Sequence, residues 1–326
     1  MSSLIPVVLL LGLLTGCATV PTYGVPGTRL ERLGDEIMVC GQLFHTGVPV
    51  VLWTDPGGYD AYRAECKFTP DQPMPSKPVS DSPIRYSTLR RHLSDEVATR
   101  VRHEGWSLPL LREWTDLFVM HYDVCGTSRR CFKVLHDIRG LSVHFMLDVD
   151  GTIYQTLDLK ERAWHAGSAN DRSIGIEIAN IGAYPDMTTL DKWYGHDDDG
   201  LPYLTLPEGM GDGGVRTAGF VARPARPEPV TGEIQGRALR QYDLTDAQYD
   251  SLIKLTATVC TVLPRIEADY PRDQDGRLRT TILSDDEFER FSGLLGHWHV
   301  SEAKVDPGPA FDWDRLIEGV DELLAN

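Results

Sequence analysis

The sequence lacks the basic runs and metal-binding cysteine pairs that mark several common classes of protein. It has 32 Lys and Arg against 48 Asp and Glu, a formal net charge of −16 over 326 residues. Phosphate backbones are neutralised by clustered basic residues, and no Lys/Arg run is sustained here, so nucleic acid is not expected as a partner. Neither a C-x-x-C pair nor an H-E-x-x-H motif occurs, which gives no support to a cysteine zinc site or to a zinc peptidase of that class.

A long apolar segment is also missing, because the apolar run at residues 4–14 is shorter than the roughly 20 residues that cross a bilayer. A cleaved export signal fits this run better. Residues 14–17, Leu-Thr-Gly-Cys, resemble the lipobox of bacterial lipoproteins, which implies a signal over 1–17 and a lipid anchor on Cys17. Ala18 stands where Asp would signal inner-membrane retention, so the pattern resembles that of outer-membrane lipoproteins facing the periplasm. A plain secretory signal or a buried apolar segment is the alternative.

The cysteine count agrees with export. Six cysteines without a lipidated Cys17 leave an odd number, so they cannot all pair. Cys125 and Cys131 lie close together in a short polar loop, which favours a local disulfide in an oxidising compartment. Cys40 with Cys66 would be a second disulfide, and Cys260 is expected as a buried thiol on the apolar side of a helix.

The chain is long enough for one large domain with appendages, and its composition changes along its length. Short β-type runs at 37–39 and 48–53 are broken by glycines, and five prolines between residues 70 and 83 exclude a helix interior or a central strand. We therefore expect a tether over 18–28, a small β-rich appendage over 29–68, a Pro-rich linker over 69–85, a helical connector over 86–110 and a catalytic domain over 111–326.

Several segments of the catalytic portion have the pattern of an α/β fold. Residues 117–120 form an apolar run of strand length, with His121 at its end. Strands are also expected at 143–147 and 152–157, joined by an Asp-Gly turn, and at 173–179. In the last of these, isoleucines alternate with Gly175 and Glu177, so the bare backbone and the carboxylate share a surface. We expect the cleft on that surface.

Residues 184–242 are rich in Gly, Pro and Asp and are expected to be a long loop insertion without elements of its own, either a wall of the cleft or disordered. Thr245 and Gln248 form a capping-box pattern that opens a helix over 246–263, and Pro264 ends it. A final helix is expected over 313–324.

These motifs together resemble type 2 N-acetylmuramoyl-L-alanine amidases and the related peptidoglycan recognition proteins. The resemblance covers residues 111–326 except the long insertion. It implies a central mixed β-sheet flanked by helices. The residues that carry it are the strand ending in His121, Gly-Leu-Ser-Val-His-Phe at 140–145, Arg-Ala-Trp-His-Ala-Gly at 162–167, Ser-Ile-Gly-Ile-Glu at 173–177, Gly-His at 296–297 and Lys-Val-Asp-Pro-Gly-Pro at 304–309.

The resemblance implies a role for each matching residue. His121, His297 and Asp306 would bind Zn2+, with an open fourth position for water. Glu177 would take the proton of that water, and Lys304 would stabilise the oxyanion. His165 and Ala166 would contact the substrate. That substrate would be peptidoglycan or its muropeptides, cut between the lactyl group of N-acetylmuramic acid and L-alanine. A non-catalytic peptidoglycan-binding receptor on the same fold is the alternative.

From the sequence alone, purely structural roles for these residues remain open. Glu177 in an apolar strand could be a buried ion-pair partner, for example of Lys304. Asp306 could cap a turn. His144 is expected to be a structural histidine. His299, two residues after His297 where the amidases carry an acidic residue, could compete for the metal.

Overall fold

The computed structural model describes residues 24–68 and 84–325. The chain divides into a unit that ends at Arg32 and a unit that begins at Leu33. In the first unit, residues 24–32 contain a turn but neither helix nor strand. The expected signal with Cys17, most of the expected tether and nearly all of the expected linker lie outside the described residues. Within the described ranges, no helix has both the length and the apolarity to span a membrane.

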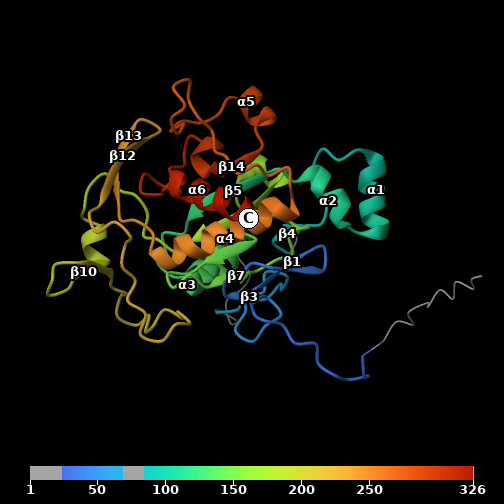
Figure 1. Ribbon diagram of the computed structural model, residues 1–326, viewed down its shortest axis with the longest axis horizontal. Helices are drawn as coiled ribbons and strands as arrows, with labels where there is room; N and C mark the ends of the chain where they lie inside the picture. Colours follow the sequence, from blue (N-terminus) through green and yellow to red (C-terminus); the bar gives the residue numbers. More distant parts are fainter. Residues whose placement is uncertain (1–23, 69–83, 326) are drawn as a thin grey trace, which may run out of the picture. The chain divides into compact units, whose positions relative to one another are not determined.

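The described residues form a six-stranded mixed sheet in the order β14-β5-β9-β6-β7-β3. Figure 1 labels β14, β5, β7 and β3 of this sheet. Neighbouring strands are parallel except β6 and β7, which form the antiparallel hairpin expected from the Asp-Gly turn. The sheet confirms the expected α/β fold class. Its strands are β14 (Gly293–Gly296), β5 (Leu117–Tyr122), β9 (Ser173–Ile178), β6 (Phe145–Leu147), β7 (Ile153–Gln155) and β3 (Val50–Leu52).

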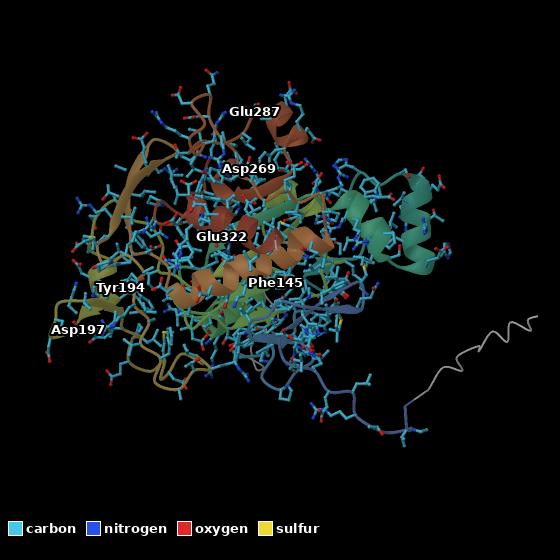
Figure 2. All side chains as sticks on the ribbon, viewed as in Figure 1. Phe145, Tyr194, Asp197, Asp269, Glu287 and Glu322 are labelled. Carbon is cyan, nitrogen blue, oxygen red and sulfur yellow. The ribbon has the colours of Figure 1, made fainter. Side chains whose placement is uncertain are left out.

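Two helices cover one face of the sheet, α4 (Asp246–Val262) and α6 (Trp313–Leu324), and they pack against each other (Figure 1). The capping box of α4 forms as expected, with Thr245 and Gln248 each bonding the other's backbone N–H. Phe118 and Ile176 belong to the same buried cluster as residues of these helices. Phe145, labelled in Figure 2, is also fully buried there.

The opposite face of the sheet packs against α3 (Ser128–Phe132) and the π-helix η1 (Lys133–Ile138). Phe132 and Leu135 of this segment share a buried cluster with Met146 and Tyr154. Side chains alternate along a strand, so His121 on β5 and Glu177 on β9 point to this second face. The expected site surface is therefore the face that α4 and α6 leave uncovered.

The remaining short elements lie around this core. They are α1 (Asp95–Glu104), α2 (Leu108–Trp114), α5 (Asp285–Arg290), the 3-10 turns η2 (Gly167–Asp171) and η4 (His297–His299), and the strand pair β4 (Tyr86–Ser87) and β8 (Arg162–Ala163).

The expectation of a separate β-rich appendage over 29–68 is wrong. β1 (Glu36–Val39) and β2 (Gln42–His45) form a hairpin, but β3 pairs in parallel with β7 at the edge of the central sheet. The hairpin is also hydrogen-bonded to the end of β7 and to the chain after it. The Met38 N–H donates to Gln155 Oε1 at 2.7 Å, and the Cys40 N–H donates to Asp158 Oδ1 at 2.8 Å. Residues 33–68 are thus part of the main domain.

The insertion 184–242 also differs from the expectation of a loop without its own elements. It contains η3 (Leu190–Lys192) and two antiparallel hairpins, β10 (Tyr194–His196) with β11 (Pro202–Leu204) and β12 (Val230–Ile234) with β13 (Arg237–Gln241). Tyr194, labelled in Figure 2, packs on Tyr242 with ring centroids 4.1 Å apart. The insertion therefore has a small buried cluster of its own.

The expected disulfides are not formed, because all five described cysteines are free thiols. Cys125 and Cys131 are nevertheless buried neighbours, and the hydrogen bond between their side chains, with burial, raises the pKa of Cys131. Cys260 is buried on α4, as expected, and burial raises the pKa of its thiol to about 12.

The hairpin between β6 and β7 holds a buried carboxyl group that makes stability depend on pH. Burial raises the pKa of Asp148 from 3.8 to about 7, and its Oδ2 has no hydrogen-bond partner among the described residues. The folded state keeps this proton more tightly than the unfolded state. Its stabilising contribution is therefore complete below about pH 4 and is lost as the pH rises through about 7.

We therefore expect Asp148→Asn to raise the melting temperature above that of the parent protein by roughly 2–4 °C at pH 8, and by little at pH 4. Asn retains an oxygen for the Val149 N–H that Asp148 Oδ1 now accepts at 2.9 Å. Asp250→Asn, at an exposed position of α4, is the control. Calorimetry at both pH values makes the comparison, and a difference that did not change with pH would contradict the raised pKa.

Candidate metal centre

Residues from distant parts of the chain line one pocket of about 280 Å³ on the open face of the sheet. Strand β5 supplies His121 and the adjacent strand β9 supplies Glu177, which are partners in the parallel register. His297 begins η4 directly after β14, and Lys304 and Asp306 follow in the next loop. The residues expected from sequence to bind metal and carry out the chemistry therefore come together.

Two imidazoles meet the carboxylate of Asp306. His121 Nδ1 lies 2.8 Å and His297 Nδ1 3.0 Å from Asp306 Oδ2, and the two rings are 4.5 Å apart between centroids. The three ligand atoms all lie within 4.8 Å of one another, and the three residues are buried. Asp306 is thus more than a residue that caps a turn, because its carboxylate contacts both imidazoles.

The environment of His121 and Asp306 favours the protonation states that a metal requires of such ligands. Burial, and then the neighbouring His297, lower the pKa of His121 to about 4, so this imidazole is neutral near pH 7. Burial alone would raise the pKa of Asp306, but the charge of His297 and the hydrogen bonds from both imidazoles outweigh it and hold this pKa well below its ordinary value. A neutral imidazole and an ionised carboxylate are ready to coordinate.

This donor set fits zinc. Zinc takes His nitrogens and carboxylate oxygens in tetrahedral sites, and three protein ligands with one open position is the pattern of catalytic sites. The three side chains all face a pocket large enough for water and a substrate group. Two imidazoles and one carboxylate suit zinc, whereas magnesium and calcium prefer sets of ligands that are all oxygen atoms.

Glu177 and Lys304 line the same pocket beside these three residues. Burial raises the pKa of Glu177 well above its ordinary value, and the carboxylates of Asp306 and Asp123 raise it further. The charge of Lys304 acts in the opposite direction, but no ion pair joins the two side chains at 4.0 Å or less in the described structure. The alternative of a buried Glu177–Lys304 ion pair is therefore not what the structure contains.

His165 lies against the metal-site histidines. Its Nδ1 is 3.0 Å from His121 Nε2, and its Nε2 is 3.2 Å from Ser173 Oγ. Gly175 on β9 leaves the room for this ring, because a Cβ there would lie 2.5 Å from His165 Cε1. His165 therefore orients His121 as well as lining the pocket.

Ala166, which the sequence predicts to contact the substrate, is turned away from the pocket. It is 1% exposed, is absent from the pocket wall, and packs with Leu117, Val119 and Leu295 beneath the site. Its backbone N–H donates to Asn170 Oδ1 at 2.7 Å. The neighbouring His165 faces the pocket while Ala166 points into the core.

Two other histidines have both ring nitrogens occupied by the backbone. His299 Nδ1 accepts from the Gly296 N–H at 2.9 Å, and its Nε2 donates to the Arg279 carbonyl at 2.7 Å. His144 Nδ1 likewise accepts from the Gly175 N–H, and its Nε2 donates to the Glu161 carbonyl. Neither ring has a nitrogen left for a metal, so His299 does not compete and His144 is structural.

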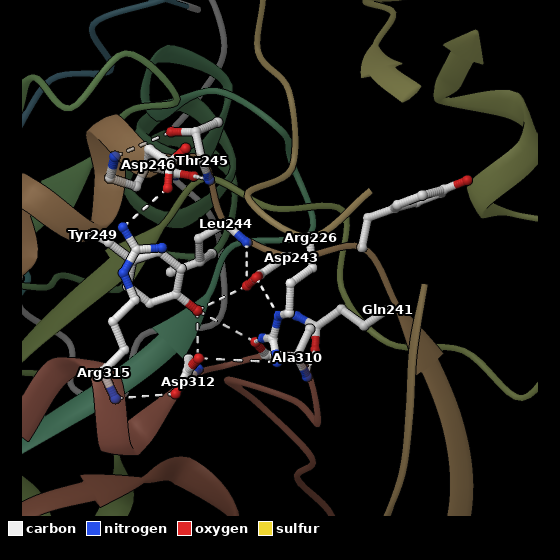
Figure 3. A network of polar contacts seen from close by, with 12 residues as sticks. Arg226, Gln241, Asp243, Leu244, Thr245, Asp246, Tyr249, Ala310, Asp312 and Arg315 are labelled. Atoms are coloured by element: carbon white, nitrogen blue, oxygen red, sulfur yellow. Dashed lines mark hydrogen bonds and ion pairs between the residues drawn. The ribbon is translucent and has the colours of Figure 1, made fainter. Parts of the chain in front are cut away.

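The loop that carries Asp306 is held by residues that the sequence did not single out. Gln241, at the end of β13, donates from Nε2 to the Pro307 carbonyl at 3.0 Å and accepts at Oε1 from the Ala310 N–H at 3.0 Å. Beyond it, Tyr249 of α4 donates to Asp243 and accepts from the Asp312 N–H at 2.9 Å (Figure 3). The folded insertion and α4 thus position the loop of a metal ligand.

One pocket wall was also missed. Val134 and Leu135 of the π-helix η1, and Arg139 and Leu141 after it, also line the pocket. No motif marks these residues, because a π-helix is rare and short and leaves no periodic pattern in the sequence. Only the expectation that Cys125 and Cys131 share a loop pointed to this region, and both cysteines do line the pocket.

Comparison with known proteins gives a match over most of this fold. Residues 112–309 match the family described as N-acetylmuramoyl-L-alanine amidase. The 1,6-anhydro-N-acetylmuramyl-L-alanine amidase AmpD of Haemophilus influenzae is 22% identical over 198 residues, 58% of this chain and 63% of that protein. AmpD of Salmonella typhimurium strain LT2 is 25% identical over 185 residues, 54% of this chain and 55% of that protein. The chain thus spans less than two thirds of these relatives.

Solved structures with similarity include a selenomethionine derivative of AmpD, with 22% identity, a TM-score of 0.32, and coverage of 64% of this chain and 86% of that one. Another is the N-acetylmuramyl-L-alanine amidase AmiD from E. coli in complex with anhydro-N-acetylmuramic acid-L-Ala-D-gamma-Glu-L-Lys. It has 18% identity, a TM-score of 0.35, and coverage of 67% and 59%. The fold of this chain is assigned from its own strand order and register.

The support that Gln241 gives to the Asp306 loop is testable. We expect Gln241→Ala to weaken zinc binding about 10- to 100-fold, because the loop would lose both bonds that fix it. Zinc competition with a chromophoric chelator measures this effect without relying on activity. Thr231→Ala, at an exposed position of the same hairpin, is the matched control. Equal zinc affinity of the Gln241 variant and the parent would refute the role.

Proposed function

Because the chain belongs to the N-acetylmuramoyl-L-alanine amidase family, we propose that it is a zinc-dependent amidase of the cell envelope. Its substrate would be peptidoglycan or the muropeptides derived from it. The bond cut would be the amide between the lactyl group of N-acetylmuramic acid and L-alanine. The observation that carries this proposal is the meeting of His121, His297 and Asp306 in one pocket with Glu177 and Lys304.

Zinc held by the two histidines and Asp306 would supply a Lewis acid that polarises the carbonyl and lowers the pKa of a water molecule towards 7. Glu177 takes a proton from the attacking water as its oxygen bonds to the amide carbon. The Lys304 ammonium stabilises the negative charge that develops on the carbonyl oxygen. As the carbon–nitrogen bond breaks, Glu177 returns the proton to the nitrogen of L-alanine. The second proton of the water also ends on this nitrogen, which leaves a lactyl carboxylate and an ammonium group on L-alanine.

The environment of Glu177 suits this transfer. A carboxylate that accepts and then returns a proton works best when its pKa lies near the operating pH, and burial with the neighbouring carboxylates moves the pKa of Glu177 upward. His165 holds His121 in place through the bond between their ring nitrogens. Val134 and Leu135 of the π-helix also line the pocket.

The first test is mass spectrometry of purified sacculi and of anhydro-muropeptides after incubation with the protein. We expect release of free stem peptides, lost after chelation and restored by zinc. Glu177→Gln should lower kcat by about 10²- to 10⁴-fold while zinc content is kept, because only the proton transfer is removed.

Glu287→Gln, on the surface helix α5, is the control for a lost carboxylate. A zinc-loaded, folded protein that sediments with sacculi but releases no peptide would refute the amidase and identify a binding receptor on the same fold. Activity that is unchanged in the Glu177 variant would refute the assigned base.

The proposal places the enzyme at the outer membrane, facing the periplasm, through a lipid on Cys17. It rests on the lipobox-like residues 14–17 and the following Ala18. We expect the protein to partition with membranes in a bacterium that processes lipoproteins, and Cys17→Ser to move it to the soluble fraction. The mass of the mature N-terminus measures the acyl groups directly. An unmodified N-terminus in a secreted protein would contradict the anchor and favour a plain export signal.

A further inference from the structure

A second, larger groove of about 940 Å³ adjoins the metal pocket. Val134 lines both cavities, so the two cavities meet beside the segment formed by α3 and η1, which forms one wall of the groove. The other wall is the turn at residues 207–213 of the insertion. This groove is therefore built partly from a segment outside the motifs that carry the family resemblance.

The wall formed by α3 and η1 carries three cations, Arg129, Arg130 and Lys133, on one short segment. Within residues 24–68 and 84–325, none of the three forms an ion pair with a carboxylate. The chain as a whole has a net charge of −16, but these three unpaired cations give their side of the cavity a positive charge. Such a surface attracts an anionic group.

Contacts between its two walls hold the groove in shape. The Arg130 guanidinium lies over the Trp193 ring, 5.2 Å from its centroid, and its Nη1 is 3.5 Å from Met210 Sδ. Both partners belong to the insertion. The chain at Gly214 passes so close to α3 that a Cβ there would lie 2.8 Å from Arg129 Cδ. The two walls therefore contact each other, and Arg130 is oriented before a ligand arrives.

The insertion wall carries the opposite charge. Glu208 and Asp212 line the groove there and are exposed, and Asp212 Oδ1 accepts only the Gly214 N–H of its own turn, at 2.9 Å. One wall is thus positive and the other negative. This arrangement matches a ligand that presents a carboxylate on one side and an ammonium group on the other.

We propose that this groove binds the peptide portion of the substrate, with a peptide carboxylate on the Arg129–Lys133 wall and the ammonium of a diamino residue on the Glu208–Asp212 wall. The inference rests on the proposed amidase function. The scissile amide would lie in the metal pocket and the peptide would pass Val134 into the groove. The peptide in the AmiD complex, L-Ala-D-gamma-Glu-L-Lys, has this chemistry, because a γ-linked Glu keeps a free α-carboxylate and Lys has an ammonium.

The test compares Arg129→Gln, Lys133→Gln and Glu208→Gln with the parent protein. Lys254→Gln on α4, outside both cavities, is the matched control for a lost surface cation. The substrates are anhydro-N-acetylmuramic acid-L-Ala-D-γ-Glu-L-Lys, the same compound with its carboxylates converted to carboxamides, its norleucine analogue, and anhydro-N-acetylmuramic acid-L-Ala.

We expect each Arg129 or Lys133 variant to raise KM for the full peptide roughly tenfold with kcat little changed, as for the loss of one charge-assisted contact. The carboxamide should bind the parent more weakly and lose nothing further in these two variants. Glu208→Gln should weaken binding of the Lys peptide but not of the norleucine peptide. The shortest substrate, which does not reach the groove, should be indifferent to all variants.

Equal KM values for the parent and the groove variants on the full peptide would overturn the inference while leaving the amidase intact. If no substrate were cleaved, the amidase proposal would fail instead. Calorimetric titration with free L-Ala-D-γ-Glu-L-Lys then tests the groove without catalysis. Binding that is lost in Lys133→Gln but kept in Lys254→Gln supports the groove, and absent or equal binding refutes it.

Discussion

The parallel pairing of β5 with β9 is the constraint on which the site depends. Its register sets His121 opposite Glu177, and the alternation of each strand turns both side chains to the same face. The other face is fixed by Phe118 and Ile176, which are buried against the helices. A slip of one residue in this register would turn His121 or Glu177 into that core, so burial of one face of the strands determines which side chains line the pocket on the other face.

The second half of the metal site depends on contacts between distant parts of the chain. His297 follows a strand of the same sheet, but Asp306 lies in a loop that the sheet does not reach. Its position is set by Gln241 and by the network around Tyr249 (Figure 3). The two imidazoles then meet a carboxylate whose direction is already determined, which is the preorganisation that a metal site requires.

The sequence predicted the parts of this structure that are encoded locally. Apolar runs and the isoleucine alternation around Glu177 predicted strands β5 and β9, and the Thr245–Gln248 pair predicted the start of α4. The edge strand β3 was assigned to an appendage because its partner, β7, lies about a hundred residues away and leaves no local signal.

The sequence-based predictions for the insertion and for single residues also fail for physical reasons. The insertion is rich in Gly, Pro and Asp, which predicts a loop. It nevertheless forms two hairpins, and aromatic packing, such as that of Tyr194 on Tyr242, stabilises this region. The neighbours His165 and Ala166 point in opposite directions, which the sequence does not reveal. That His299 is a structural residue followed only from the backbone groups that occupy both its nitrogens.

Strand β3 and helix α6 extend the domain beyond the residues that match the family. The span that matches the family, 112–309, begins after β3 and ends before α6. A chain limited to that span would leave one side of β7 without its backbone partner, and α4 without the helix that packs on it. Exposed strand edges and uncovered apolar surfaces are what drive chains to associate. The residues that match the family are therefore fewer than the residues that complete the sheet and the helices that cover it.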